Sequence, residues 1–247
     1  MQLQKILLGI IFTGGLLKTP AQQPSGKQQA VAQLQTITER YRNFKGLHFS
    51  VRYRYAEETK PSVWLDSLKG DFAIYGDQYH YSLDSTEFIS GKELSVILFK
   101  QDQLMYLAKG TSALQQGNPI ALLDSLLLKN NDVDGRMQET KDERTIIFSF
   151  HPGQKAKRVE YVVDKTTGYI TKMISVVPAR ELYDPSVQQK VEGDAYAIVE
   201  TSFTDFRQED PTGKGWDLSR LFKKEGKEYI PLPPYDAYKI VLGSPDL

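Results

Sequence analysis

Apolar and polar side chains alternate along several stretches of this chain, and this alternation constrains its fold more than any other feature. In residues 47–57, LHFSVRYRYAE, positions 47, 49, 51, 53 and 55 are apolar or aromatic, and positions 48, 50, 52 and 54 are polar. Successive side chains of a strand point to opposite faces, so this period of two predicts a half-buried strand.

The same signal recurs between short turns along most of the chain. Gly76-Asp77, Ser90-Gly91-Lys92 and residues 165–168 are the turns, and the few cues for parallel connections predict a mainly antiparallel sheet. Besides 47–57, strands are predicted at 70–75, 78–83, 94–99, 104–107, 145–150, 159–163, 169–177, 195–206 and 238–242.

Apolar residues at spacings of three and four predict helices in two places. One helix covers about 31–44 and ends before Gly46. A second begins at Pro119, after the cap residue Asn118, with an apolar stripe that includes Leu123 and Leu127. A further short helix is expected at 218–224, ended by Gly226.

The N-terminus has the pattern of a cleavable export signal. Lys5 precedes an apolar run at 6–17, and small residues allow cleavage after Ala21, which predicts a signal peptide at 1–21. The run is too short to span a membrane, because a spanning helix needs about 20 apolar residues. With no cysteine, the chain has neither disulfides nor a cysteine to carry a lipid anchor. We expect a soluble periplasmic protein whose residues 22–247 form one domain.

Charge and motifs exclude several function classes. Lys+Arg and Asp+Glu number 31 each, so no basic field attracts nucleic acid. His48, His80 and His151 form no metal-binding pair, and pairs such as Glu57-Glu58 are expected by chance among 31 carboxylates. No nucleophile elbow, phosphate loop or dinucleotide fingerprint occurs. We therefore predict a protein that is not an enzyme and has no cofactor or metal.

One face of the predicted sheet is aromatic and aliphatic and must be covered. The helices and the C-terminal segment either cover it completely and leave a plain core, or leave an apolar groove that accepts acyl chains. The alternating pattern is compatible with both.

The order of the elements resembles the LolA family of periplasmic lipoprotein carriers. The matching stretches are GLHFSVRYRY, LKGDFAIYGDQYHYSL, EFISGKELSVILFKQDQLMYL, GNPIALLDSLLL, RVEYVVDKTTGYITKMISV and YAIVETSFTDFR, which together lie within residues 28–207. The resemblance implies an unclosed β-barrel with a helical lid over an apolar cavity that carries lipid or lipoprotein acyl chains.

Two departures bear on mechanism. Tyr75-Gly76-Asp77-Gln78 stands where the carriers have a basic Arg-Pro element, and the ending EYIPLPPYDAYKIVLGSPDL differs from that of the family, so the part from about 208 is a divergent extension. A shared fold does not fix a function.

The preferred interpretation is a carrier that binds acyl chains and shuttles them towards the outer membrane, with membrane-associated donor and acceptor proteins as possible partners. The rival is an envelope sensor or secretion-apparatus subunit that binds a protein, which the extended proline-rich stretch at 231–238 favours. The expected lipid-binding residues on the concave face and in the lid are Phe49, Val51, Tyr53, Phe72, Ile74, Tyr79, Tyr81, Leu94, Val96, Leu123 and Leu127.

Overall fold

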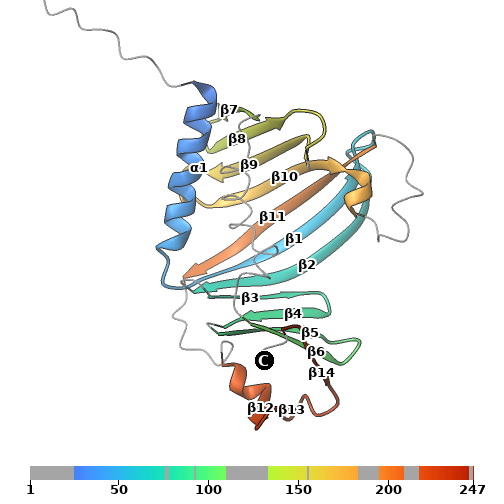
Figure 1. The fold of residues 1–247 in the computed structure, drawn as a ribbon. Coiled ribbons are helices and arrows are strands. Elements are labelled where there is room, and N and C mark those ends of the chain that lie inside the picture. Colours follow the sequence, from blue (N-terminus) through green and yellow to red (C-terminus); the bar gives the residue numbers. More distant parts are fainter. Residues whose placement is uncertain are drawn as a thin grey trace, which may run out of the picture.

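The computed structural model describes residues 25–75, 78–91, 93–109, 133–154, 156–182, 195–208, 217–244 and 247. Over these residues the chain is mostly β with one α-helix, and its large curved sheet is not closed into a barrel (Figure 1). The predicted fold class is thereby confirmed at the level of a curved, unclosed, mainly antiparallel sheet.

The main sheet has 12 strands in the order β14-β6-β5-β4-β3-β2-β1-β11-β10-β9-β8-β7. Pairing of β1 with β11 joins two meanders that are far apart in sequence, and every pair is antiparallel except β14 with β6. The strands are β1 Leu47–Glu57, β2 Trp64–Tyr75, β3 Gln78–Leu83, β4 Thr86–Ser90, β5 Leu94–Phe99, β6 Leu104–Lys109, β7 Val133–Glu139, β8 Glu143–Phe150, β9 Arg158–Asp164, β10 Ile170–Pro178, β11 Tyr196–Gln208 and β14 Lys239–Leu242.

Helix α1, Gly26–Arg42, begins earlier than the apolar periodicity predicted. Ser25 and Gln28 form a capping box, in which each side chain accepts a hydrogen bond from the backbone N–H of the other residue. The helix packs across β7 and β8, where a Cβ atom on Gly135 would lie 2.8 Å from the Cα of Lys27. A glycine is therefore required where helix and strand backbones approach this closely.

The predicted helix at 218–224 is wrong. A 3-10 turn at Leu218–Arg220 is followed by a small two-stranded sheet of β12, Phe222–Glu225, and β13, Glu228–Pro231. Gly226 has φ of +61° and forms the hairpin turn, a backbone conformation that favours glycine. The glycine that was expected to end a helix instead reverses a strand.

Several predicted features lie outside the described residues. They are the signal peptide at 1–21 and the second helix, with Leu123 and Leu127. Among the residues that are described, no helix has both the length and the apolar character needed to cross a membrane.

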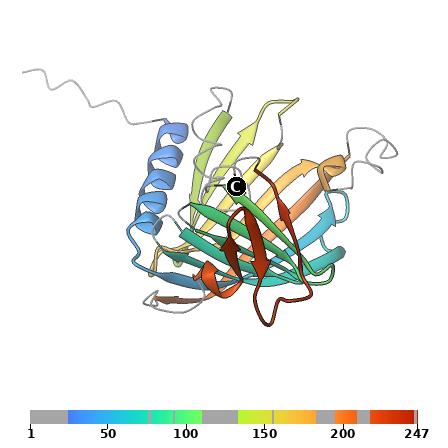
Figure 2. The same cartoon turned by 60° about the horizontal axis from the view of Figure 1, so that its bottom comes forward.

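Two apolar clusters lie on opposite faces of the sheet. We call the face that carries Phe49, Phe72 and helix α1 the inner face, and the opposite one the outer face. At β4–β6 the outer face is covered by the C-terminal segment 217–244, which is seen in red across these strands in Figure 2. The sheet is thus buried by a different part of the chain on each side.

Candidate functional site

An array of aromatic rings crosses the inner face from β1 to β4. The strand register places Phe49 opposite Phe72, Phe72 opposite Tyr81, and Tyr81 opposite Phe88. Adjacent ring centroids in this row are 5.4, 5.5 and 5.3 Å apart, and the rings are stacked. Aromatic residues directly opposite one another stabilise a sheet, and here they also form a continuous apolar floor.

The array continues towards helix α1. Phe206 lies 5.4 Å from Phe49 and 4.4 Å from Tyr169, whose ring contacts Tyr41 of α1 at 6.2 Å. The Tyr41 hydroxyl accepts a hydrogen bond of 3.0 Å from the backbone N–H of Ile170. The helix end of the inner face is therefore closed by packed rings.

Burial decreases along the strands away from this closed end. In β1, Phe49 and Val51 are buried, whereas Tyr53 and Tyr55 are only partly buried. A cavity of about 110 Å³ lies at this transition and is lined by Val51, Tyr53, Phe72, Tyr81, Ser82 and Leu83.

Gly70 explains part of the shape of this cavity. It lies in register between Val51 and Leu83, two residues that line the cavity, and it adds no side chain between them. A Cβ atom at this position would come within 2.1 Å of the Ser82 carbonyl oxygen. Glycine is therefore needed for the close approach of β2 and β3.

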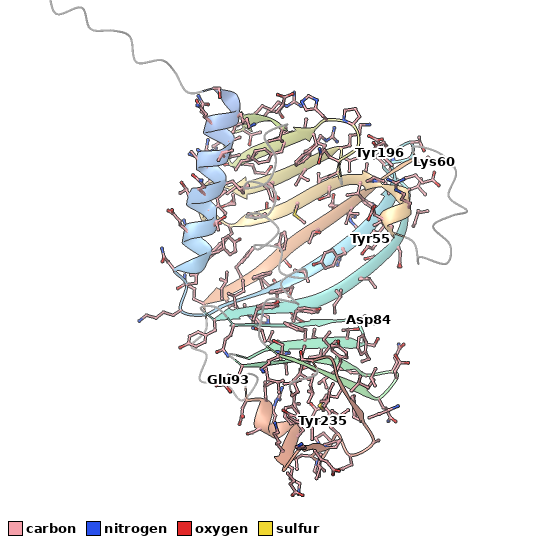
Figure 3. All side chains as sticks on the ribbon, in the orientation of Figure 1. Tyr55, Lys60, Asp84, Glu93, Tyr196 and Tyr235 are labelled. Atoms are coloured by element: carbon pink, nitrogen blue, oxygen red, sulfur yellow. The ribbon has the colours of Figure 1, made fainter. Side chains whose placement is uncertain are left out.

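A larger pocket of about 920 Å³ lies at the far end of the long strands. Tyr55 and Leu68 contribute to it from the inner face beside Tyr53, which lines the smaller cavity. Figure 3 shows Tyr55, Tyr196 and Lys60 at this end of β1, β2 and β11. The lining residues are Tyr55, Ala56, Glu57, Glu58, Thr59, Leu65, Asp66, Leu68, Ala179, Glu181, Leu182, Ala195, Tyr196 and Ala197.

Several tyrosines of the inner face are poorly solvated. Burial raises the pKa of Tyr53 and of Tyr79 to about 12, and it also raises the pKa of Tyr81. The pKa of Tyr55 is raised by burial and by the nearby Asp66 carboxylate. Loss of water disfavours the charged phenolate, so this surface suits apolar ligand atoms.

Seven of the predicted binding residues share the inner face. Phe72, Tyr81, Val51 and Tyr53 line the small cavity, and the other three contribute to the same apolar cluster. These seven are Phe49, Val51, Tyr53, Phe72, Ile74, Tyr79 and Tyr81.

The expectation that Leu94 and Val96 lie on the same face is wrong. The β4–β5 register pairs Ile97 with Phe88, so Ile97 lies on the inner face and Val96 on the outer face. Leu94 and Val96 belong to the outer cluster. The run LSVILF contains too few polar residues to indicate which side of the strand is inward.

The histidines and the acidic pair weighed in the sequence lie in separate contacts within the described ranges. No group of three or more His, Asp or Glu side chains there could hold a metal ion. His80 lies 2.9 Å from Glu87 on the outer face, and His48 contacts Arg207 at 2.9 Å. Glu57 and Glu58 pair separately with Lys60 and Lys157, at 3.6 and 2.6 Å.

The mouth of the large pocket was not predicted. Its residues come from β1, β2, the turn at Ala179–Leu182 and the start of β11. Each of these segments looks like an ordinary strand end or loop, and only the pairing of β1 with β11 brings them together. The alternating positions of Tyr53 and Tyr55 were the one sequence pattern that indicated inward-facing side chains at this end of the inner face.

No protein-family model matches the chain, and no curated protein matches its sequence. The solved structures similar to it include an uncharacterized conserved protein from Thermus thermophilus, at 6% identity and a TM-score of 0.45, which covers 87% of this chain and 98% of its own. A LolA superfamily protein from Nitrosomonas europaea has 9% identity and a TM-score of 0.32, with coverage of 72% and 94%. The Mycobacterium tuberculosis lipoprotein LppX has 10% identity and a TM-score of 0.39, with coverage of 74% and 97%.

A LolA superfamily protein is thus among the similar structures, and this is the family that the sequence motifs resemble.

Proposed function

We propose that this chain is a non-catalytic carrier that binds acyl chains of a lipid or lipoprotein on its inner face. The observation that carries the proposal is the succession of a closed aromatic floor, a small apolar cavity and a large pocket along one face. A long apolar chain would lie along Tyr53 with its end near Tyr81. Its polar end would lie among the residues of the larger pocket.

Burial of apolar surface would supply the affinity. Each buried CH₂ group contributes roughly 0.8 kcal/mol, so a long chain needs no ionic anchor. No charged side chain lines the small cavity, whereas carboxylates occur in the larger pocket. The 920 Å³ volume falls within the usual size of ligand pockets, about 300–1,000 Å³.

The feature that favoured a protein-binding rival has a different role in the structure. The proline-rich stretch 231–238 forms turns, with hydrogen bonds from Tyr235 N to Leu232 O and from Tyr238 N to Tyr235 O. Both tyrosines pack against the outer cluster. This stretch therefore contacts its own sheet.

The direct test is binding of a fluorescent long-chain fatty acid to the purified protein. Tyr81→Asp places a carboxylate in the small cavity and should weaken binding at least about tenfold, because a charge in apolar surroundings is strongly disfavoured. Leu83→Trp should weaken it too by filling the 110 Å³ space. Leu242→Asp is the matched control, since Leu242 is 44% exposed and lines neither pocket. Wild-type affinity in folded Tyr81→Asp and Leu83→Trp proteins would refute the carrier proposal.

Export to the periplasm belongs to the same proposal. The supporting feature is the predicted signal at 1–21, and cleavage after Ala21 would leave a mature chain that begins at Gln22. Mass spectrometry of the protein recovered from a periplasmic fraction checks this, and a mass that retains Met1–Ala21 would contradict it.

A further inference from the structure

Large exposed apolar side chains gather at the mouth of the large pocket. Among the described residues, five large hydrophobic side chains are exposed, and three of them lie at this end of the molecule. Leu65 is 61% exposed and Leu182 is 39% exposed, and both line the pocket. Val63, at 56%, is two residues from Leu65. We call Val63, Leu65 and Leu182 the apolar collar.

A β-bulge accounts for the exposure of Leu65. The β1–β2 register pairs Tyr55 with Asp66 and then Ala56 with Trp64, so Leu65 has no residue opposite it. A bulge redirects a side chain away from the regular pleat. Here it directs a leucine to the rim of a pocket.

The neighbouring β2 residues form an amphipathic edge. β3 pairs with β2 only from Gly70 onwards, so the end of β2 around Trp64 extends past its neighbour. The guanidinium of Arg54 lies 4.1 Å from the centre of the Trp64 ring and also pairs with the Glu200 carboxylate. Tryptophan combines an apolar body with a polar tip, the combination that suits a membrane–water interface.

Charges of the described residues around the mouth nearly cancel. Glu57 pairs with Lys60, Glu58 with Lys157, and Glu181 with Arg180. Asp66 accepts a hydrogen bond from Ser67 N, and among the described residues it has no cationic partner. The described part of this surface has no excess of positive charge with which to attract anionic lipids.

From these observations we propose that the apolar collar docks the pocket mouth on the surface of a lipid bilayer, so that acyl chains enter directly from the membrane. The proposal rests on the proposed carrier function. A bilayer is favoured over a protein partner because the collar opens into the acyl pocket, and acyl chains reside in bilayers. The near balance of charge fits a zwitterionic surface, and three side chains give a contact that is weak and reversible.

The test measures transfer of a fluorescent fatty acid from phosphatidylcholine vesicles to the protein by stopped flow. Transfer through contact has a rate that rises with vesicle concentration, whereas transfer through water does not. Leu65→Asp with Leu182→Asp should slow transfer about tenfold, because a charged side chain is costly at the apolar boundary. Leu242→Asp should leave the rate unchanged.

Affinity measured with a water-soluble short-chain fatty acid separates this proposal from the carrier function. Val63 is 56% exposed and does not line the pocket, so Val63→Asp should slow transfer from vesicles and keep the wild-type affinity. Exchange of phosphatidylcholine for anionic phosphatidylglycerol should not speed transfer. A rate that is independent of vesicle concentration, an unchanged rate in the double variant, or an equal loss in Leu242→Asp would each overturn membrane docking. Failure of the wild-type protein to bind any fatty acid would instead overturn the carrier proposal itself.

Discussion

The two apolar faces of the sheet differ in what covers them. On the outer face, Ile89, Val96, Leu98, Met105 and Leu107 are each 0% exposed and pack under Leu221 and Phe222 of the C-terminal segment. On the inner face the aromatic floor is closed near helix α1, but Tyr53, Tyr55 and Leu68 border open space.

This difference shows how one sheet can separate stability from binding. The outer face has a cover from its own chain and strand β14 along the β6 edge, so its apolar surface stabilises the fold. The inner face retains cavities that a ligand can fill. The same alternation of side chains produces both surfaces, and the cover determines which one retains cavities.

Phe72 should give the largest effect, because it lies where the floor meets the small cavity. Its ring stacks against Phe49 and Tyr81 and is 2% exposed. Phe72→Ala should lower the free energy of unfolding by about 3–5 kcal/mol through the void it leaves, and it should also weaken fatty-acid binding. Urea denaturation and fluorescence titration measure the two effects. Phe72→Leu, the milder control, should lose less of both, and a Phe72→Ala protein of wild-type stability would show that the floor is not closely packed.

Replacement of Leu98 tests the role of the outer face. Leu98→Ala should destabilise the protein by about 2–5 kcal/mol, because Leu98 is 0% exposed in the outer cluster. Fatty-acid affinity of the folded fraction should stay within about twofold of wild type, a change below 1 kcal/mol. A tenfold loss of affinity would mean that the two faces are coupled, and the separation of roles would fail.

Strand content could be predicted because the physical signal is local. The segment LHFSVRYRY alternates strictly, and DKTTGY contains the turn residues that the β9–β10 hairpin requires, with Gly168 at φ +69°. Which side chains of β5 point to the inner face could not be predicted, because LSVILF is apolar nearly throughout. Its face is fixed by pairing of Ile97 with Phe88, which is a property of the assembled sheet.

The site could be predicted only where it follows a single strand. Tyr53 and Tyr81 were found from alternation, but the pocket mouth joins Asp66, Leu182 and Tyr196, which no local pattern relates. Leu65 is exposed because of a bulge, and its surroundings in the sequence, WLDSLK, give no sign of one. Most of the site residues that could not be predicted are therefore brought together by the register between strands that are distant in sequence.

Glu87 gives a smaller, pH-dependent effect on the outer face. His80 donates a hydrogen bond to its carboxylate at 2.9 Å, Lys100 lies at 3.0 Å, and Arg220 of the C-terminal segment lies at 3.7 Å. The hydrogen bond from His80, followed by that from Lys100, lowers the pKa of Glu87 from 4.5 to about 2.

A lowered pKa stabilises the folded state above the pKa of the unfolded chain. The contribution of Glu87, about 2 kcal/mol with the side chain 12% exposed, should be complete at pH 7 and lost as the pH falls from 4.5 towards 2. Urea denaturation of wild type and Glu87→Gln should therefore differ at pH 7 and converge near pH 2. A difference that stays constant with pH would contradict the ionic origin.

Replacement of Tyr53 should give the smallest change in the free energy of unfolding, and this change depends only on the inner face. Because burial raises its pKa to about 12, its phenol stays neutral in the folded protein where an exposed tyrosine ionises near 10. A raised pKa means stability that is complete below pH 10 and lost as the pH rises towards 12. Relative to Tyr53→Phe, the wild-type protein should lose about 1 kcal/mol between pH 9 and pH 11, and at pH 7 the two should bind fatty acid alike. The Tyr79 contribution is present in both proteins and cancels. Equal losses at high pH would show that water reaches Tyr53, and the distinction between a dry inner face and an ordinary exposed one would not hold.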